Sequence, residues 1–445
     1  MSEERYIAAI EISSSKIIGS VGRVYPNGQV DIIAVEQEKC HDNVRYGIIQ
    51  NIEETSLRVA RVLERLERKP SVSPRRIRSV FVGLSGRSMR SIPTTVRLNL
   101  PDDTEITDSV LSRLRSDALQ AAIDNTLEVV DAVPRRYRVG KVETITPKGA
   151  IGNEIEAEYD IIVCRPELKR NLTRVIRDKL SIEAMGFVVT ALATGHLILS
   201  EQEKTLGCML VDMGAETTTV SIYRNKALYY MATLPLGGRH ITRDIQSLSL
   251  LEDRAEEIKN TSGCSIAPEN PSTLNLNGIK VSDVINLTVA RSEEIVANIT
   301  EQLAYAGIKE KELPGGVICI GGGMRLNGMT ELISRQLGLP VKIGRLPSYV
   351  VIDDLKGAST EITEVGSILY AGATMTDEQC LELPHTEELP VNGEPNDNPD
   401  DTSGIANNSD KQRRPKGGNS FGTRFRAFTS RLFSNPEDDD SSLLE

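Results

Sequence analysis

The alternation of apolar and polar residues near the start of the chain predicts a three-stranded meander. Strands are expected over 6–12, 17–24 and 30–35, with short polar turns between them. Apolar residues at roughly helical spacing then predict a helix over 53–68, which stops before Pro70. The N-terminal region is therefore expected to be mixed α/β.

The same order of elements returns in the second half of the chain. Strands are expected over 208–211, 218–223 and 227–234, followed by helical segments over 241–259. In both copies a further strand runs into a glycine-rich stretch, at 80–86 and 317–323. A duplicated unit is the simplest interpretation. Two like domains that face each other form a cleft, in which loops from both can contact a ligand.

Residues 84–163 have no counterpart in the second copy. They contain a predicted helix over 109–124 and two strand-like runs around 137–145 and 155–163, which indicates an inserted α+β subdomain. The expected fold class is α/β with duplicated domains. Its first domain comprises 1–83, 164–205 and 361–380, and its second comprises 206–360 with a small subdomain at about 241–310.

Length and composition narrow the class of protein. The chain has 445 residues, of which 39% are hydrophobic and 26% charged, so several globular subdomains are expected. No apolar run approaches the roughly 18 to 20 residues that a membrane-spanning helix needs, which argues against an integral membrane protein. The first residues lack the basic region and cleavage site of a signal peptide, which predicts a cytoplasmic protein.

Cysteine usage and net charge argue against further classes. The six cysteines lie far apart with no C-x-x-C, and with only four histidines they suit neither zinc ribbons nor a disulfide framework. They are expected to be buried as small hydrophobes. The net charge of −11 argues against nucleic-acid binding, which needs a field that attracts phosphate.

Two hairpin turns, one in each copy, carry polar groups suited to phosphate. The first comprises Ser13, Ser14, Ser15 and Lys16, although a serine-rich turn on its own is more often structural. The second follows Asp212 and contains Gly214, Thr217 and Thr218. Glu11 and Asp212 end equivalent strands, so the pair is suited to hold Mg²⁺ through water.

A third loop, Gly321-Gly322-Gly323, follows a predicted strand and precedes a helical stretch over 329–336. Glycines at such a place let a flat ring or a phosphate lie against the backbone, although glycine turns are as often purely geometric. The three loops together favour a nucleotide site.

The last part of the chain has a different composition. Residues 381–420 are rich in Pro, Asn, Asp, Glu and Gly, which predicts a disordered linker. Beyond it, over 421–434, apolar residues fall within roughly 60° of a helical wheel, namely Phe421, Phe425, Phe428 and Leu432, with Phe433 following. Arginines flank this stripe, namely Arg424, Arg426 and Arg431. The pattern favours an amphipathic helix that binds anionic lipid, with an acidic tail over 435–445. Docking on a protein partner is the alternative.

The combination of these loops resembles the superfamily of actin, the heat-shock chaperone ATPases and hexokinase. More narrowly, the chain resembles the FtsA family, the actin-like membrane anchors of the bacterial FtsZ ring. The segments that carry this likeness are 83–86, 133–137, 152–157, 235–245, 255–259 and 291–295.

The resemblance implies ATP and Mg²⁺ as cofactors. It places the first hairpin loop on one side of the phosphates and the second on the other, and it places the adenosine against Gly238, Glu256, Lys259, Gly321, Gly322 and Gly323. It implies that the FtsZ C-terminal tail binds near Arg291 and Glu294. It also implies self-association into actin-like filaments, downstream division partners on the inserted subdomain, and a location at the cytoplasmic face of the membrane at the septum.

Several positions depart from the family pattern. Glu11 stands where an aspartate is usual, Ser13 replaces a glycine, and Ala215 and Glu216 replace a glycine pair. A carboxylate at Glu216 beside a phosphate is expected to cost roughly 1 to 4 kcal/mol, which would weaken nucleotide binding. Fast hydrolysis is therefore not expected, and no catalytic residue is assigned.

The leading hypothesis is a cytoskeletal adaptor that polymerises and anchors FtsZ filaments to the membrane, with at most slow ATPase activity. One alternative is a small-molecule kinase or ATPase of the same superfamily, which would need an acid poised for a substrate hydroxyl. The other is a pilus-assembly actin homologue, which shares the inserted subdomain but does not need the C-terminal helix.

Overall fold

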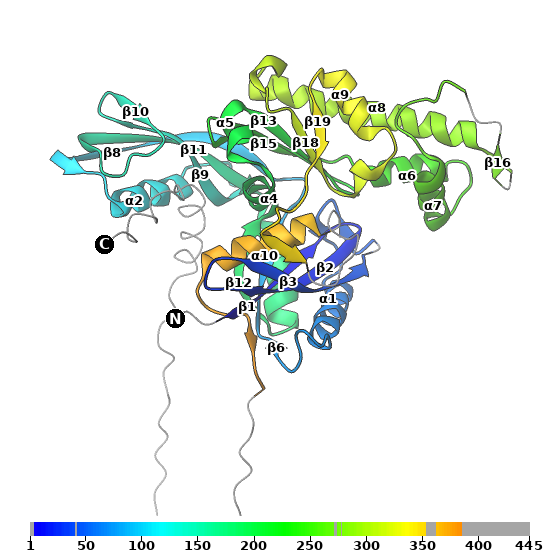
Figure 1. Ribbon diagram of the computed structural model, residues 1–445, viewed down its shortest axis with the longest axis horizontal. Helices are drawn as coiled ribbons and strands as arrows, with labels where there is room; N and C mark the ends of the chain where they lie inside the picture. Colours follow the sequence, from blue (N-terminus) through cyan, green and yellow to red (C-terminus); the bar gives the residue numbers. More distant parts are fainter. Residues whose placement is uncertain (1–3, 41, 271–273, 277, 353–361, 385–445) are drawn as a thin grey trace, which may run out of the picture.

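The computed structural model describes residues 4–40, 42–270, 274–276, 278–352 and 362–384 (Figure 1). The predicted tail helix and most of the predicted linker lie outside these residues. In the described part of the chain, no helix combines the length and apolar character needed to cross a bilayer.

The first domain is built on a six-stranded sheet. Its strand order is β12 (Glu183–Val189), β7 (Ser79–Leu84), β1 (Arg5–Ile12), β2 (Lys16–Val24), β3 (Val30–Lys39) and β20 (Val350–Ile352). Strands β1 to β3 form the predicted antiparallel meander, and the predicted helix follows it as α1 (Ile52–Glu67). Helix α1 packs on β2 and β3, while α10 (Thr363–Met375) packs on β1 and β2 beside α4 (Thr190–Ile198). The face of this sheet that α10 covers is turned toward the second domain (Figure 1).

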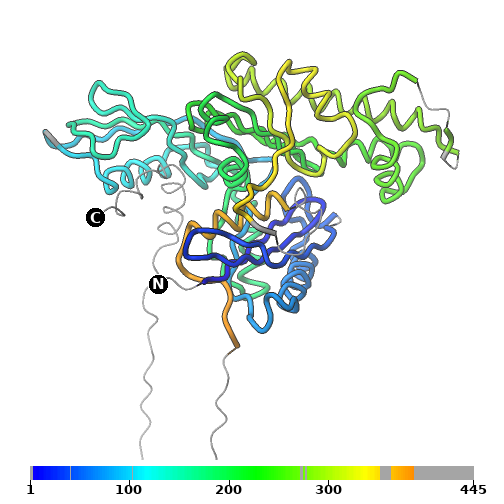
Figure 2. Tube along the Cα trace, in the orientation of Figure 1, coloured from blue at the N-terminus to red at the C-terminus, as the bar shows by residue number. Residues whose placement is uncertain are grey.

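The second domain and the inserted subdomain share one nine-stranded sheet. Its order is β10 (Val142–Thr144), β9 (Glu128–Val139), β11 (Ile151–Cys164), β8 (Arg90–Glu105), β15 (Ala227–Leu234), β14 (Thr218–Arg224), β13 (Cys208–Met213), β18 (Val317–Ile320) and β19 (Val341–Ile343). The inserted subdomain adds α2 (Asp108–Leu119), and the second domain adds α6 (Gly238–Gln246), α7 (Glu252–Ser262), α8 (Val281–Ala306) and α9 (Met329–Leu337). The inserted subdomain and the α6–α7 region project from opposite ends of the molecule (Figures 1 and 2).

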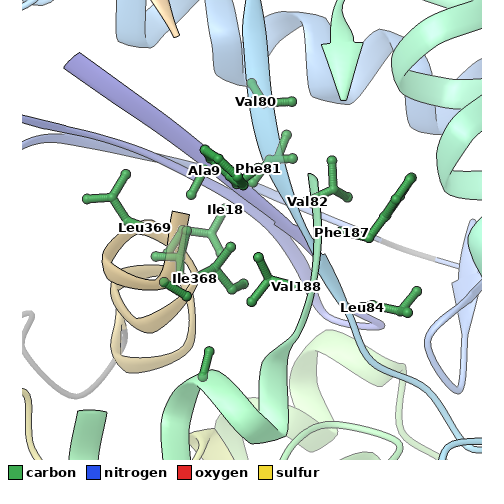
Figure 3. Packing of buried hydrophobic residues seen from close by; sticks show 14 of the residues in the cluster. Ala9, Ile18, Val80, Phe81, Val82, Leu84, Phe187, Val188, Ile368 and Leu369 are labelled. Carbon is green, nitrogen blue, oxygen red and sulfur yellow. The ribbon is translucent and has the colours of Figure 1, made fainter. Parts of the chain in front are cut away.

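Three apolar clusters stabilise these parts. The first fills the first domain and continues into one face of the second domain's strands, where it includes Leu210, Leu228 and Ile318. The other two lie in the second domain and in the inserted subdomain. In the first domain Ile368 and Leu369 of α10 lie close to the central strands, which also contribute Phe81 (Figure 3). Five of the six cysteines are buried and Cys264 is half-buried, and all six are free thiols. The prediction that the cysteines are buried as small hydrophobes is therefore confirmed for all but Cys264.

Several predicted boundaries are wrong. The strand-like run over 137–145 is a hairpin, because the chain turns at Gly140, which has φ +57°, between β9 and β10. The predicted helix over 109–124 ends at Leu119. Strand β20 pairs with β3, so the chain enters the first sheet before residue 361. Strand β21 (Leu381–Glu382) pairs with β6 (Arg76–Ile77), so the predicted linker begins with ordered residues.

The junction between the inserted subdomain and the second domain rests on few contacts. Strands β8 and β15 pair at Arg90 and Ala232, and the amide of Met231 donates to Ser91 Oγ at 2.8 Å. Arg135 binds both oxygens of Asp160 at 2.7 and 2.8 Å, and it also donates to the carbonyl of Tyr229 at 2.7 Å. Arg135 therefore connects two strands of the inserted subdomain to β15.

We expect Arg135→Ala to lower the free energy of unfolding by about 3 kcal/mol, because it leaves the carboxylate of Asp160 buried without its partner. Asp160 has no exposed surface. Arg136→Ala is the matched control, since Arg136 pairs with Glu158 and Glu143 at the surface and is expected to cost less than about 1 kcal/mol. Urea denaturation of both variants provides the measurement. Equal losses would contradict the role of Arg135.

Candidate functional site

A cleft of about 1240 Å³ lies between the two domains, lined by loops from both. It is large enough to enclose a small organic ligand. Most of the site residues predicted from the sequence line it, namely Glu11, Ser13, Ser14, Ser15, Lys16, Asp212, Gly214, Thr217, Gly238, Glu256, Lys259, Gly322 and Gly323. Residues that lie far apart in the chain are therefore gathered around one cavity.

The first hairpin loop is held in place by its own serines. The amide and hydroxyl of Ser13 both donate to the carbonyl of Lys16, at 3.0 and 2.9 Å. The hydroxyl oxygen of Ser14 accepts a bond from the amide of Gly47 at 3.0 Å. The side chain of Ser13 thus closes the turn, and Ser14 is tied to a neighbouring segment of the first domain.

The second hairpin loop corrects one predicted contact. Thr218 has no exposed surface, and its hydroxyl donates to the carbonyl of Leu236 at 2.8 Å, so it does not line the cleft. Because side chains alternate along a strand, Thr217 and Thr219 lie on the cleft side instead. The hydroxyl of Thr219 is hydrogen-bonded to that of Thr233 at 3.0 Å.

The glycines of the third loop have different environments. Gly321 has φ +91°, and a Cβ there would lie 2.5 Å from the carbonyl oxygen of Met213 and 2.6 Å from Asp212 Oδ1. It allows β18 to end against β13 but does not itself line the cleft, contrary to prediction. Gly322 has nothing within 4 Å of the position of a Cβ, so its surface is open to the cleft.

Three carboxylates line the same part of the cleft: Glu11, Asp212 and Glu364 at the start of α10. Burial raises the pKa of Glu11 well above its ordinary value, and the charges of Glu364 and Asp212 raise it further. Burial and the charge of Glu364 likewise raise the pKa of Asp212. Carboxylates that repel one another in this way are stabilised by a nearby cation, so their chemistry fits Mg²⁺.

Direct coordination by a ring of side chains is not indicated. Among the described residues, no group of three or more His, Cys, Asp or Glu is arranged to hold a metal ion. Because Mg²⁺ usually keeps several of its water ligands, contact through water stays the prediction for these carboxylates.

Glu256 and Lys259 of α7 form an ion pair that lines the cleft. Lys259 Nζ donates to Glu256 Oε2 at 2.6 Å, to Thr242 Oγ1 at 3.1 Å and to the carbonyl of Gly238 at 3.3 Å. Burial opposes ionisation of Glu256, but the charge of Lys259 and the hydrogen bonds from Lys259, Thr242 and Asn260 together outweigh it and lower the pKa of that carboxyl. The pair joins α6 to α7 and is fixed in place before any ligand binds.

The charge of Glu216, in the second hairpin loop, is compensated by neighbouring donors. Its carboxylate has no exposed surface, and it lies 3.4 Å from Arg45 and 3.6 Å from Arg239. It also accepts hydrogen bonds from Arg243 and, at 2.7 Å, from the amide of Tyr46. The repulsion expected from the sequence is therefore offset by the arginines.

Many residues that line the cleft were not predicted from the sequence, among them Thr219, Arg239, Arg325 and Glu364. Thr219 was recoverable from strand alternation, because it lies two residues after Thr217. Arg239 lies in the segment 235–245 that carries the family resemblance. Nothing in the local sequence around Glu364 or Arg325 indicates that they reach the cleft.

Arg291 and Glu294 lie away from the cleft lining, on α8. Arg291 binds Asp244 of α6 through two nitrogens, at 2.6 and 3.0 Å, and also binds Glu294. The predicted membrane residues, Phe421 to Phe433, lie outside the described residues.

Comparison with known proteins gives matches over most of the chain. Residues 209–356 match the family described as cell division protein FtsA, and residues 86–163 match the SHS2 domain inserted in FtsA. The chain is 30% identical to the cell division protein FtsA of Porphyromonas gingivalis over 404 residues, which cover 86% of this chain and 84% of that protein. It is 26% identical to FtsA of Bacillus subtilis, over 83% of this chain and 84% of that one.

Among solved structures, a chain of the PilM–PilN type IV pilus biogenesis complex superposes with a TM-score of 0.60 at 15% identity. The match covers 82% of this chain and 98% of that one. At this identity the likeness shows a shared fold, in agreement with the α/β class of duplicated actin-like domains and an inserted subdomain. With its duplicated domains, its SHS2 insertion and these relatives, the chain belongs to the FtsA family of actin-like cell division proteins.

Proposed function

We propose that the chain binds ATP with Mg²⁺ in the cleft, assembles into actin-like filaments, and anchors FtsZ filaments to the cytoplasmic face of the cell membrane at the division septum. The observation that carries this proposal is the convergence of both hairpin loops and the third glycine loop on one cleft, in a chain of the FtsA family. Hydrolysis, if it occurs, is expected to be slow.

The cleft residues have distinct parts in this proposal. The backbone of the two hairpin loops and the charge of Lys16 suit the phosphates, while the open surface of Gly322 leaves room for a flat ring. The Glu256–Lys259 pair would contact the ribose and base. Glu11 and Asp212, with Glu364 close by, would hold hydrated Mg²⁺, which supplies positive charge to the phosphates.

The proposed membrane contact rests on the sequence of the tail. Four apolar residues on one face of a helix would each contribute roughly 1.5 to 3 kcal/mol at full burial. Each nearby arginine would add about 1 kcal/mol at an anionic surface. A helix of this length is expected to be mostly unfolded in water and to fold on lipid.

The proposed protein contacts lie on different parts of the molecule. The FtsZ tail would bind near Arg291 and Glu294 on α8 of the second domain. Downstream division proteins would bind the inserted subdomain, which projects from one end of the molecule (Figure 1). The two partners would then contact one subunit without competing for the same surface.

Isothermal titration calorimetry tests the nucleotide site. We expect micromolar ATP binding in Mg²⁺, and we expect Gly321→Ala to weaken it by about tenfold or more, because a Cβ would collide with the end of β13. Gly28→Ala is the matched control, since Gly28 also has positive φ, at +81°, but has nothing within 4 Å. If the parent protein releases no heat of binding, the nucleotide proposal fails.

The rate of ATP hydrolysis separates the proposed adaptor from an enzyme. An ATP turnover of roughly 10 per second would favour a metabolic kinase instead.

Liposome flotation tests the membrane anchor. Replacing both Phe425 and Phe428 by Asp puts charge into the apolar stripe and is expected to release the protein from anionic vesicles. The matched control replaces Asn396 and Asn398 by Asp, which adds the same charge in the predicted linker and is expected to leave flotation unchanged. ATP is held constant in both arms because filaments add avidity through many tails. Flotation of the Phe425→Asp, Phe428→Asp protein at the level of the parent would exclude the anchor and favour a protein partner for the helix.

A further inference from the structure

A short turn of the first domain contacts both the first and the second hairpin loop. Residues Tyr46 and Gly47 join β4 (Val44–Arg45) to β5 (Ile48–Ile49), and this hairpin packs in the core of the first domain. The amide of Tyr46 donates to the carboxylate of Glu216 in the second loop at 2.7 Å. The next amide, of Gly47, donates to Ser14 Oγ in the first loop at 3.0 Å. Two consecutive amides thus connect the opposite sides of the cleft.

Charge reinforces the contact across the cleft. Arg45, which directly precedes the turn, approaches Glu216 from the first domain, while Arg239 and Arg243 approach it from α6 of the second. The ring of Tyr46 also lies 6.0 Å from that of His240 on α6. Glu216 is fully buried. If the donors of one domain move away, the carboxylate loses part of its hydrogen bonding and must be solvated by water instead. Separation of the domains at this point therefore exposes Glu216.

The same turn also contacts the base of the inserted subdomain. The carbonyl of Tyr46 accepts a bond from the amide of Arg87 at 3.1 Å, a few residues before β8 begins. At Gly47, which has φ +79°, a Cβ would lie 2.7 Å from the Cα of Gly86 and 2.8 Å from the carbonyl of Ser85. The close approach of these two backbone segments leaves no room for a side chain.

We propose that the Tyr46–Gly47 turn and Glu216 form a clasp that holds the two domains in the closed arrangement and transmits opening of the cleft to the inserted subdomain. Tyr46, Gly47 and Glu216 are positioning residues in this proposal, because they act through the loops rather than on a ligand. Its functional meaning rests on the proposed nucleotide site, but the clasp itself can be measured without nucleotide.

Distance measurement between the two domains tests the clasp in the nucleotide-free protein. Spin labels are attached to cysteines that replace Leu57 on α1 and Tyr305 on α8, whose exposed fractions are 54% and 72%. Cys264→Ser removes the half-buried thiol, while the other five cysteines are buried. We expect one narrow distance distribution in the parent, and a shift to a second, longer distance in both Glu216→Gln and Arg45→Gln.

Two variants guard against a folding defect. Arg45 has a side-chain exposure of 39%, so Arg45→Gln weakens the clasp without leaving a cavity in the core. Arg335→Gln is the matched control, because it removes a charge at the surface of α9, far from the turn in the chain. Among the described residues, Arg335 forms an ion pair only with Glu331, at 3.2 Å. This variant is expected to retain the distances of the parent. Distances that stay unchanged in Arg45→Gln and Glu216→Gln, or that shift equally in Arg335→Gln, overturn the clasp.

Amide hydrogen exchange tests the link to the inserted subdomain in the same samples. We expect faster exchange at Arg87 in Glu216→Gln and in Gly47→Ala, because both displace the turn whose carbonyl holds that amide. In Arg335→Gln the exchange rate of Arg87 should match the parent. Protection of Arg87 that stays unchanged in both turn variants would overturn transmission to the inserted subdomain.

Discussion

The carboxylate of Glu216 is fully buried where the two domains meet, and a buried charge is stable only when donors surround it. Those donors come from both domains: Arg45 and the amide of Tyr46 from the first, Arg239 and Arg243 from the second. The β4–β5 turn therefore lies against the second hairpin loop, where it supplies two of these donors. Because the next amide along the turn binds Ser14, the first loop is placed by the same contact. One turn thus contacts both loops and one buried carboxylate.

The inserted subdomain interrupts the sequence of the first domain, but its sheet joins that of the second domain. Its ends connect to β7 and to α3 (Pro166–Thr173) of the first domain, yet its sheet continues into β15 of the second. Arg135 strengthens that junction by binding Asp160 and the carbonyl of Tyr229. The insertion therefore contacts the second domain at the β8–β15 junction and the first domain at the turn at Tyr46. An insertion that contacts both domains is well placed to respond to the state of the cleft.

The duplicated meanders were predictable because alternation of apolar and polar residues records which face of a strand is buried. Strand β8 was not predicted, since Pro93 and Pro101 interrupt its pattern. The side of the strand taken by Thr218 was also misjudged, although alternation from Thr217 would have corrected it. Glu364 could not be predicted, because it reaches Glu11 and Asp212 only through packing of α10 on the first sheet. The arginines around Glu216 come from segments far apart in the chain, so the sequence showed its charge but not its compensation.

In the proposed function, one nucleotide contacts both domains at once. Hydrogen exchange of the full chain, compared with and without ATP and Mg²⁺, is the measurement that bears on this contact. We expect exchange to slow together in residues 13–16 of the first domain and in residues 214–217 and 321–323 of the second. Protection confined to the loops of one domain, or found only outside the cleft, would contradict it.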